Sequence, residues 1–201
     1  MFNQLNKRQQ KHFGTNTLAA PLLQANTAVQ FVAMTLLGSV VLAASAQVQV
    51  PLLPVPMTMQ PFAIMVLGLV CHWRLAMAVT VTYLAEGWAG LPVFAGFSSG
   101  IAITHTTGYL LGFVPQVVLI SVLAQRCIGK PYEPLRQIGA LLAGQLVLYS
   151  CGVAWLSTLV GLKTALVVGV FPFLPTVPFK MAFALMIARS YRRLSSAIQR
   201  G

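Results

Sequence analysis

Long apolar runs, separated by a few polar or proline-rich breaks, constrain this chain more than any other feature. Six runs can be read between the breaks, at about 28–46, 57–71, 75–89, 106–125, 135–160 and from about 179 to 193. A helix needs about 20 apolar residues to cross a bilayer. Only 7% of the residues are charged, whereas a water-soluble domain carries roughly a quarter. We therefore predict an all-α integral membrane protein with six short transmembrane helices, of which the second and third are short for a span.

The basic residues test this topology independently. If the first helix starts in the cytoplasm, eleven of the thirteen Lys and Arg residues fall on cytoplasmic segments. These are Lys7, Arg8, Lys11, Arg74, Arg126, Lys130, Arg136, Arg189, Arg192, Arg193 and Arg200. Lys163 and Lys180 fall on the outer side or in the membrane. Because cytoplasmic loops carry the excess of basic residues, both termini are predicted to be cytoplasmic.

Three segments follow from this topology. Residues 1–26 form a polar basic tail, which we expect to be disordered or to lie along the anionic inner leaflet. Residues 27–195 form the six-helix membrane domain, and residues 196–201 form a C-terminal tail. The net charge of +11 is spread over helix ends and does not form one basic face, which argues against a nucleic-acid partner.

No set of residues in the chain indicates catalysis, a cofactor or a metal. Cys71, Cys127 and Cys151 are widely spaced and lack a metal-ligand pattern, so we expect unpaired thiols. His72 and His105 have no second ligand at metal spacing. No phosphate-binding G-x-x-x-x-G-K-[ST] loop occurs, so any ATP-driven step requires another polypeptide.

Two ionisable residues at membrane depth are the main candidates for ligand contact. Glu86 lies at the outer end of the third run, where an acid is costly unless it faces a cavity or a partner. Lys180 follows a proline-broken segment whose non-helical backbone is tolerated at this depth only within protein or beside a cavity. Alternatively, the two residues pair with each other or reach interfacial water. The second acid, Glu133, lies in a polar loop and is expected to be solvated.

The stretch 87–112 is rich in glycine and aromatic residues and suits a loop that covers an outward-facing pocket. Its aromatic residues are Trp88, Phe94, Phe97 and Tyr109, which can also form a membrane-interface belt. Further polar candidates are Gln47, Thr58, Gln60 and Thr106, each of which can serve helix packing instead. Ser39 and Ala43 form a small-xxx-small pair that would allow close approach of another helix.

Three stretches together resemble motifs of the BioY family. Residues 55–60 (VPMTMQ) resemble the motif that opens its second helix. Residues 83–96 contain YLAEG and GLPVFAG, which are similar to its most distinctive segment, and residues 106–113 (TTGYLLGF) are similar to a third motif. The resemblance covers about residues 39–193 in matching order and spacing.

The resemblance implies the biotin-specific S component of an energy-coupling-factor (ECF) transporter, a multi-pass protein of the bacterial inner membrane. Such a protein captures biotin at the outer face, and a T component with two ATPase subunits then drives release inward. No enzyme activity or cofactor is implied. The expected ligand contacts are Glu86, Lys180, Tyr109, Thr106, Phe94, Trp88, Gln60 and Thr58. Ser39 and Ala43 are expected to meet the T component.

The chain departs from the family pattern at one important position. Residues 172–180 (PFLPTVPFK) keep the family lysine, Lys180, but place Thr176 and Val177 where the family has glycine and aspartate. His105 and Thr107 also replace family residues. We hypothesise that Glu86 supplies the lost acceptor for biotin and that Lys180 serves its carbonyl or carboxylate. The alternatives are an S component for another small vitamin and a membrane scaffold without a ligand.

Overall fold

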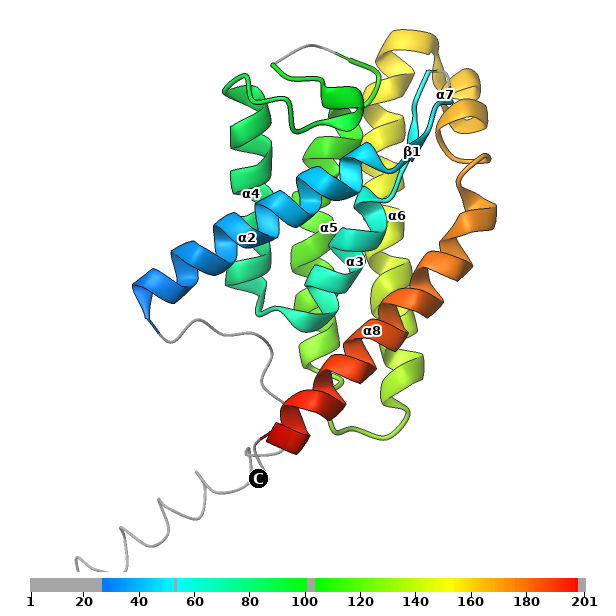
Figure 1. The fold of residues 1–201 in the computed structure, drawn as a ribbon. Helices are drawn as coiled ribbons and strands as arrows, with labels where there is room; N and C mark the ends of the chain where they lie inside the picture. The colour runs from blue at the N-terminus through cyan, green and yellow to red at the C-terminus, as the bar shows by residue number, and fades with distance from the viewer. Residues whose placement is uncertain (1–26, 53, 101–103, 199–201) are drawn as a thin grey trace, which may run out of the picture.

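The computed structural model describes residues 27–52, 54–100 and 104–198, and most of them are helical (Figure 1). The longer helices are α2 (Ala28–Gln47), α3 (Gln60–Val70), α4 (Trp73–Trp88), α5 (Thr107–Gln125), α6 (Glu133–Val160) and α8 (Val177–Ile198). The shorter elements are β1 (Gln49–Val50), β2 (Met57–Thr58), η1 (Ala95–Phe97), α7 (Leu162–Gly169) and η2 (Leu174–Thr176). Residues 1–26 and 199–201, which are the whole of the predicted N-terminal tail and half of the predicted C-terminal tail, lie outside the described residues.

The helices form a layered bundle (Figure 1). Helices α4, α5 and α6 stand side by side, and α5 packs against both of the others. Helices α2 and α8 cross this layer obliquely, α2 against α4 and α8 against α3. Helix α3 lies between them and packs on α5.

Four helical stretches of the described chain are long and apolar enough to cross a membrane. They are Ala28–Gln47, Thr107–Gln125, Glu133–Val160 and Leu162–Ser195, the last of which contains α7 and most of α8. Helices α3 and α4 have 11 and 16 residues, which is short for a 30 Å hydrocarbon core. The six predicted helices therefore match the six longer helices, whereas six complete crossings remain a prediction.

The segment between α2 and α3 differs from the prediction. The second helix was expected to start at Met57 but starts at Gln60, because Met57 and Thr58 pair with β1 and because Pro61, which has no backbone N–H, is tolerated only in the first turn of a helix. The chain instead forms the antiparallel pair β1–β2, in which Gln49 lies opposite Thr58. Helix α7 was not predicted; it follows Gly161, which ends α6 at a positive φ of 81°.

Helices α5 and α6 approach each other closely because glycines line their contact. A Cβ atom at Gly144 would lie 2.5 Å from Cγ1 of Ile120 and 3.3 Å from Cγ of Gln116. A Cβ at Gly152 would overlap the ring of Tyr109. Small residues at such contacts let helices approach in lipid, where no hydrophobic force drives them together. This close approach places side chains of α5 and α6 on one wall of the site described below.

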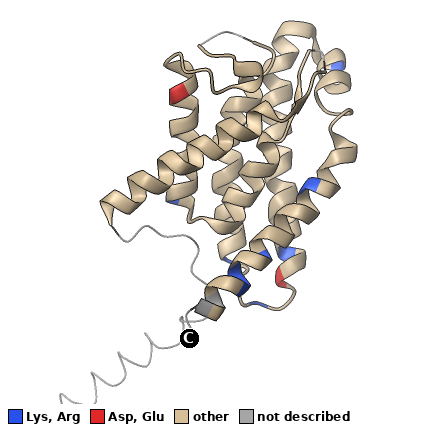
Figure 2. Cartoon of the chain, viewed as in Figure 1, with Lys and Arg blue, Asp and Glu red and all other residues tan. Residues whose placement is uncertain are grey.

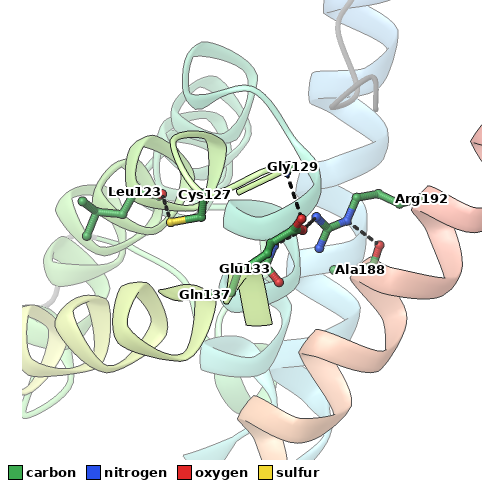
Figure 3. A network of polar contacts seen from close by, with 7 residues as sticks. All are labelled: Leu123, Cys127, Gly129, Glu133, Gln137, Ala188 and Arg192. Atoms are coloured by element: carbon green, nitrogen blue, oxygen red, sulfur yellow. Dashed lines mark hydrogen bonds and ion pairs between the residues drawn. The ribbon is translucent and has the colours of Figure 1, made fainter. Parts of the chain in front are cut away.

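One end of the bundle carries most of the described basic residues (Figure 2). At this end Glu133, at the start of α6, forms an ion pair with Arg192 of α8 (Figure 3). Its carboxylate also accepts hydrogen bonds from Gln137 Nε2 and the Gly129 backbone N–H, both at 3.0 Å. The prediction of a solvated Glu133 is therefore wrong, because α8 brings Arg192 to the α5–α6 turn.

The close contact of α5 with α6 predicts different effects for two glycines of α6. Gly144→Ala should lower the thermal stability of the purified protein, since overpacking costs about 1–3 kcal/mol. Gly139→Ala is the matched control, because nothing lies within 4 Å of a Cβ built there. It should be neutral or stabilise by up to about 1 kcal/mol. Equal melting temperatures for the two variants would contradict this packing.

Candidate functional site

A cavity of about 270 Å³ lies between the β2 region, α5, α6 and the start of α8, and neither Glu133 nor Arg192 lines it. This volume is near the lower end of the range for small-molecule sites, roughly 300–1,000 Å³. The described residues that line it come from the β2 region, α3, α4, the segments 94–100 and 104–107, α5, α6, the segment 173–176 around η2 and the start of α8. They are Val55, Pro56, Thr58, Gln60, Pro61, Trp88, Phe94, Ala95, Ser98, Ser99, Gly100, Thr104, Thr106, Thr107, Tyr109, Leu110, Phe113, Gln145, Leu148, Tyr149, Phe173, Thr176, Val177 and Lys180.

A chain of hydrogen bonds runs along one wall of this cavity. Lys180 Nζ of α8 donates to the Thr58 carbonyl of β2 at 2.9 Å. The Thr58 hydroxyl donates to Gln60 Oε1 at 3.1 Å, and Gln60 Nε2 donates to the Tyr83 hydroxyl at 2.6 Å. Tyr83 in turn donates to the carbonyl of Val93 at 3.3 Å. The chain joins α8, β2, α3, α4 and the loop after α4, so the wall is held by elements far apart in sequence.

Aromatic side chains give the cavity its apolar surface. Phe94 packs edge-on against Tyr83, with ring centroids 5.5 Å apart, and lies over Gly87, where no Cβ would fit. The Tyr109 ring lies against Gly152, and its hydroxyl donates to the carbonyl of Gly169 at 2.8 Å. Edge-to-face packing and a satisfied hydroxyl both fix ring orientation. The aromatic walls are therefore formed before any ligand arrives.

Gln47, at the end of α2, holds the segment that carries Phe94. Its Nε2 donates to the Phe94 carbonyl at 3.0 Å, and its Oε1 accepts from the Phe97 backbone N–H at 3.1 Å. The same segment closes on itself, since Phe94 N donates to the Ser98 carbonyl at 3.1 Å. The position of this segment agrees with the predicted loop over a pocket. Of its two phenylalanines, Phe94 lines the cavity and Phe97 is exposed.

Seven of the eight residues expected to contact a ligand line this cavity. They are Lys180, Tyr109, Thr106, Phe94, Trp88, Gln60 and Thr58. Glu86 is not among the lining residues; its carboxylate accepts a hydrogen bond from Ser39 at 3.0 Å. Thr176 and Val177 do line the cavity, so the position of the family aspartate faces it with an apolar side chain.

The two residues expected to meet a partner protein lie differently. Ser39 is fully buried within the chain, where α2 packs on α4 and its hydroxyl reaches Glu86. Ala43 is half-buried and packs against the core. The exposed side of α2 is formed instead by large apolar residues, namely Val29, Val32, Leu36, Leu37, Val40 and Val41.

Several lining residues were missed by the sequence analysis, above all Gln145 and Tyr149 of α6. Gln145 lies in the middle of the longest apolar run, where a polar amide is costly. This is the same signal that singled out Glu86, and it would have identified Gln145. Within the described part of the chain, no group of three His, Cys, Asp or Glu residues is placed to hold a metal ion.

The contacts of Gln47 predict a local effect on the covering segment. Gln47→Leu should increase amide hydrogen exchange in residues 94–98, since two of its hydrogen bonds hold this segment on α2. Ser45→Ala is the matched control, because the Ser45 hydroxyl donates only to the Leu42 carbonyl of its own helix among the described contacts. Exchange of residues 94–98 that is unchanged in Gln47→Leu would show that Gln47 does not hold the segment.

The comparisons with known proteins agree on one family. A model of the BioY family matches residues 15–197. A probable biotin transporter BioY from Pyrococcus horikoshii is 38% identical over 160 residues, which are 79% of this chain and 89% of the relative. One from Rickettsia prowazekii is 32% identical over 157 residues, 77% of this chain and 79% of the relative.

The fold is similar to a crystal structure of the S-component for biotin from an ECF-type ABC transporter. The TM-score is 0.70 at 22% identity, over 85% of this chain and 95% of that chain. At this identity the match concerns the fold, whereas the family model and the two relatives concern the sequence. On the combined evidence, the chain belongs to the BioY family.

Proposed function

We propose that this chain is the membrane subunit that captures biotin for an ATP-driven uptake system. The observation that carries the proposal is the cavity itself, with aromatic walls, a few fixed polar groups and a single cation, Lys180, among its described lining residues. Small-molecule sites typically combine apolar walls with a few placed polar groups. The relatives from Pyrococcus horikoshii and Rickettsia prowazekii are both named as probable biotin transporters.

The chemical groups of biotin are complementary to the side chains that line the cavity. Its fused bicycle offers an apolar surface for Phe94, Trp88 and Tyr109, and its one charged group is a carboxylate. An ammonium group is the natural partner of a carboxylate, and bonds between charged groups are the strong ones. Lys180 is therefore assigned to the carboxylate. The Thr58 carbonyl, which accepts from Lys180 in the present structure, orients the ammonium group toward the cavity wall.

We place the protein in the bacterial inner membrane with the cavity facing outward. The described basic residues of the α3–α4 hinge, the α5–α6 turn and the end of α8 lie at the opposite end of the bundle (Figure 2). Cytoplasmic loops carry the excess of basic residues, so this end is assigned to the cytoplasm. Six crossings and cytoplasmic termini follow, with α3 and α4 as short spans.

Inward release would need partners. The chain has no phosphate-binding loop, so the ATPase subunits and the T component of an ECF module are assigned as separate polypeptides. The apolar exposed side of α2 is the surface we assign to the T component, with Ala43 at its edge. Ser39 would act from inside the chain, by holding α2 on α4 through Glu86.

Calorimetric titration of the purified protein tests the ligand and the role of Lys180 together. Biotin should bind one to one, and Lys180→Met should weaken it by about tenfold or more, as expected for a lost bond of about 1.5–3 kcal/mol to a charged group. Biotinamide, which lacks the negative charge, should bind the wild type more weakly and lose little more in the variant. The control Lys163→Met changes an exposed lysine outside the cavity.

If Lys180→Met weakens biotin and biotinamide by the same factor, Lys180 does not hold the carboxylate. A folded wild-type protein that binds another small vitamin in place of biotin would favour an S component of different specificity. The scaffold alternative predicts a Glu86–Lys180 pair without a cavity. In the described structure, Lys180 instead donates to Thr58 and Glu86 accepts from Ser39.

The acceptor role that the sequence predicts for Glu86 remains a separate prediction. Its carboxylate accepts a hydrogen bond from Ser39, so direct contact with biotin would need this bond to break and the side chain to turn toward the cavity. A tenfold weaker binding of biotin by Glu86→Gln, about 1.4 kcal/mol, would support the role. Unchanged affinity with a lower melting temperature would assign Glu86 to the α2–α4 contact and leave the acceptor to a residue that lines the cavity.

A further inference from the structure

The cavity has a second polar wall, formed by Gln145 of α6 with Gln116 of α5 behind it. Gln145 lines the cavity and is 5% exposed; Gln116 is fully buried. Gln116 Nε2 donates to Gln145 Oε1 at 3.3 Å. The contact depends on the close approach at Gly144, where a Cβ would lie 3.3 Å from Cγ of Gln116.

Helix packing alone does not account for this pair. Gln116 Oε1 is buried and has no hydrogen-bond partner among the described residues. An unpaired acceptor in the interior is costly, and two apolar residues of similar size would pack here without that cost. The two amides form one hydrogen bond with each other and leave the Gln116 oxygen unpaired. This arrangement therefore indicates a function other than joining α5 to α6.

The hydrogen-bonding capacity of Gln145 identifies that task. A carboxamide has two N–H donors and two acceptor sites on its oxygen. One acceptor site takes the Gln116 N–H. What remains is one acceptor site on the oxygen and the N–H donors on the nitrogen, and both atoms are bonded to the same carbon. The edge of a cyclic urea presents the complement, an N–H donor beside a C=O acceptor.

We propose that Gln145 recognises the cyclic urea of biotin through this paired contact, and that Gln116 is a positioning residue that fixes the orientation of the Gln145 amide. The inference rests on the proposed function and deepens it. Gln145 supplies a polar contact on a different wall from Val177. Val177 stands at the position where the family has an aspartate. It also leaves Lys180, on α8, free for the carboxylate at the other end of the ligand.

A change of ligand selectivity tests the proposal. In 2-iminobiotin the urea oxygen is replaced by an imino group, and the resulting guanidine is protonated at neutral pH. Gln145→Glu is nearly isosteric and offers a carboxylate to that cation. It should shift the ratio of biotin to 2-iminobiotin affinity by about tenfold or more toward 2-iminobiotin, the scale of a charge-assisted hydrogen bond. Gln145→Leu should weaken biotin by at least about tenfold.

Gln116→Leu should reduce the discrimination between the two ligands, because the Gln145 amide is then no longer oriented. A loss of stability alone would not change this ratio. Gln137→Leu is the matched control, since Gln137 is a buried amide of α6 that donates to Glu133, far from the cavity. Its selectivity should equal that of the wild type.

The outcomes separate the two proposals. If the wild type binds biotin and Gln145→Glu leaves the selectivity ratio unchanged, the inference about Gln145 is overturned and the proposed function stands. If the folded wild type does not bind biotin, both are overturned. Should Gln145→Leu fail to fold, the nearly isosteric Gln145→Glu variant carries the test alone.

Discussion

A polar side chain inside hydrocarbon must find its partner within the protein, because no water is there to supply one. This constraint determines where the polar groups of the bundle lie. Gln60 bonds to Tyr83, Lys180 to Thr58, Ser39 to Glu86 and Gln116 to Gln145, and each pair joins two different elements. The few polar groups of the membrane domain therefore set the relative positions of the helices, and three of these four pairs lie at the walls of one cavity.

The two ends of the bundle have different tasks. At one end, the Glu133–Arg192 pair ties α8 to the α5–α6 turn among exposed basic residues (Figure 3). At the other end, the same α8 contributes Lys180 to the cavity, and α6 contributes Gln145. Helices α6 and α8 thus connect the cavity to the basic end, and glycines along α5 and α6 keep that connection closely packed.

The helices could be predicted from the sequence because their signal is local. Apolar runs, prolines and charges predicted the six longer helices. The predicted ends of α2 and α5, among others, lie within about three residues of the observed ends. The hairpin β1–β2 and helix α7 could not be predicted in this way. A proline-rich break excludes helix but does not say how the chain satisfies its remaining backbone groups.

The site could be predicted only in part, for a physical reason. Motif resemblance and polar residues at membrane depth pointed to Lys180, Gln60 and Tyr109, which do line the cavity. The direction of the Glu86 side chain depends on how α4 is rotated against α2. This rotation cannot be predicted from the local sequence. Gln145 and Gln116 come from two helices, and their meeting depends on the close contact at Gly144.

A structure of the protein with bound biotin would show whether the ligand lies between Lys180 and Gln145. Density for the ligand is expected inside the aromatic cavity. The carboxylate should lie within hydrogen-bonding distance of Lys180 Nζ, and the urea should pair with the Gln145 amide. Biotin bound outside this cavity, or inside it with both Lys180 and Gln145 turned away from the ligand, would contradict this binding mode.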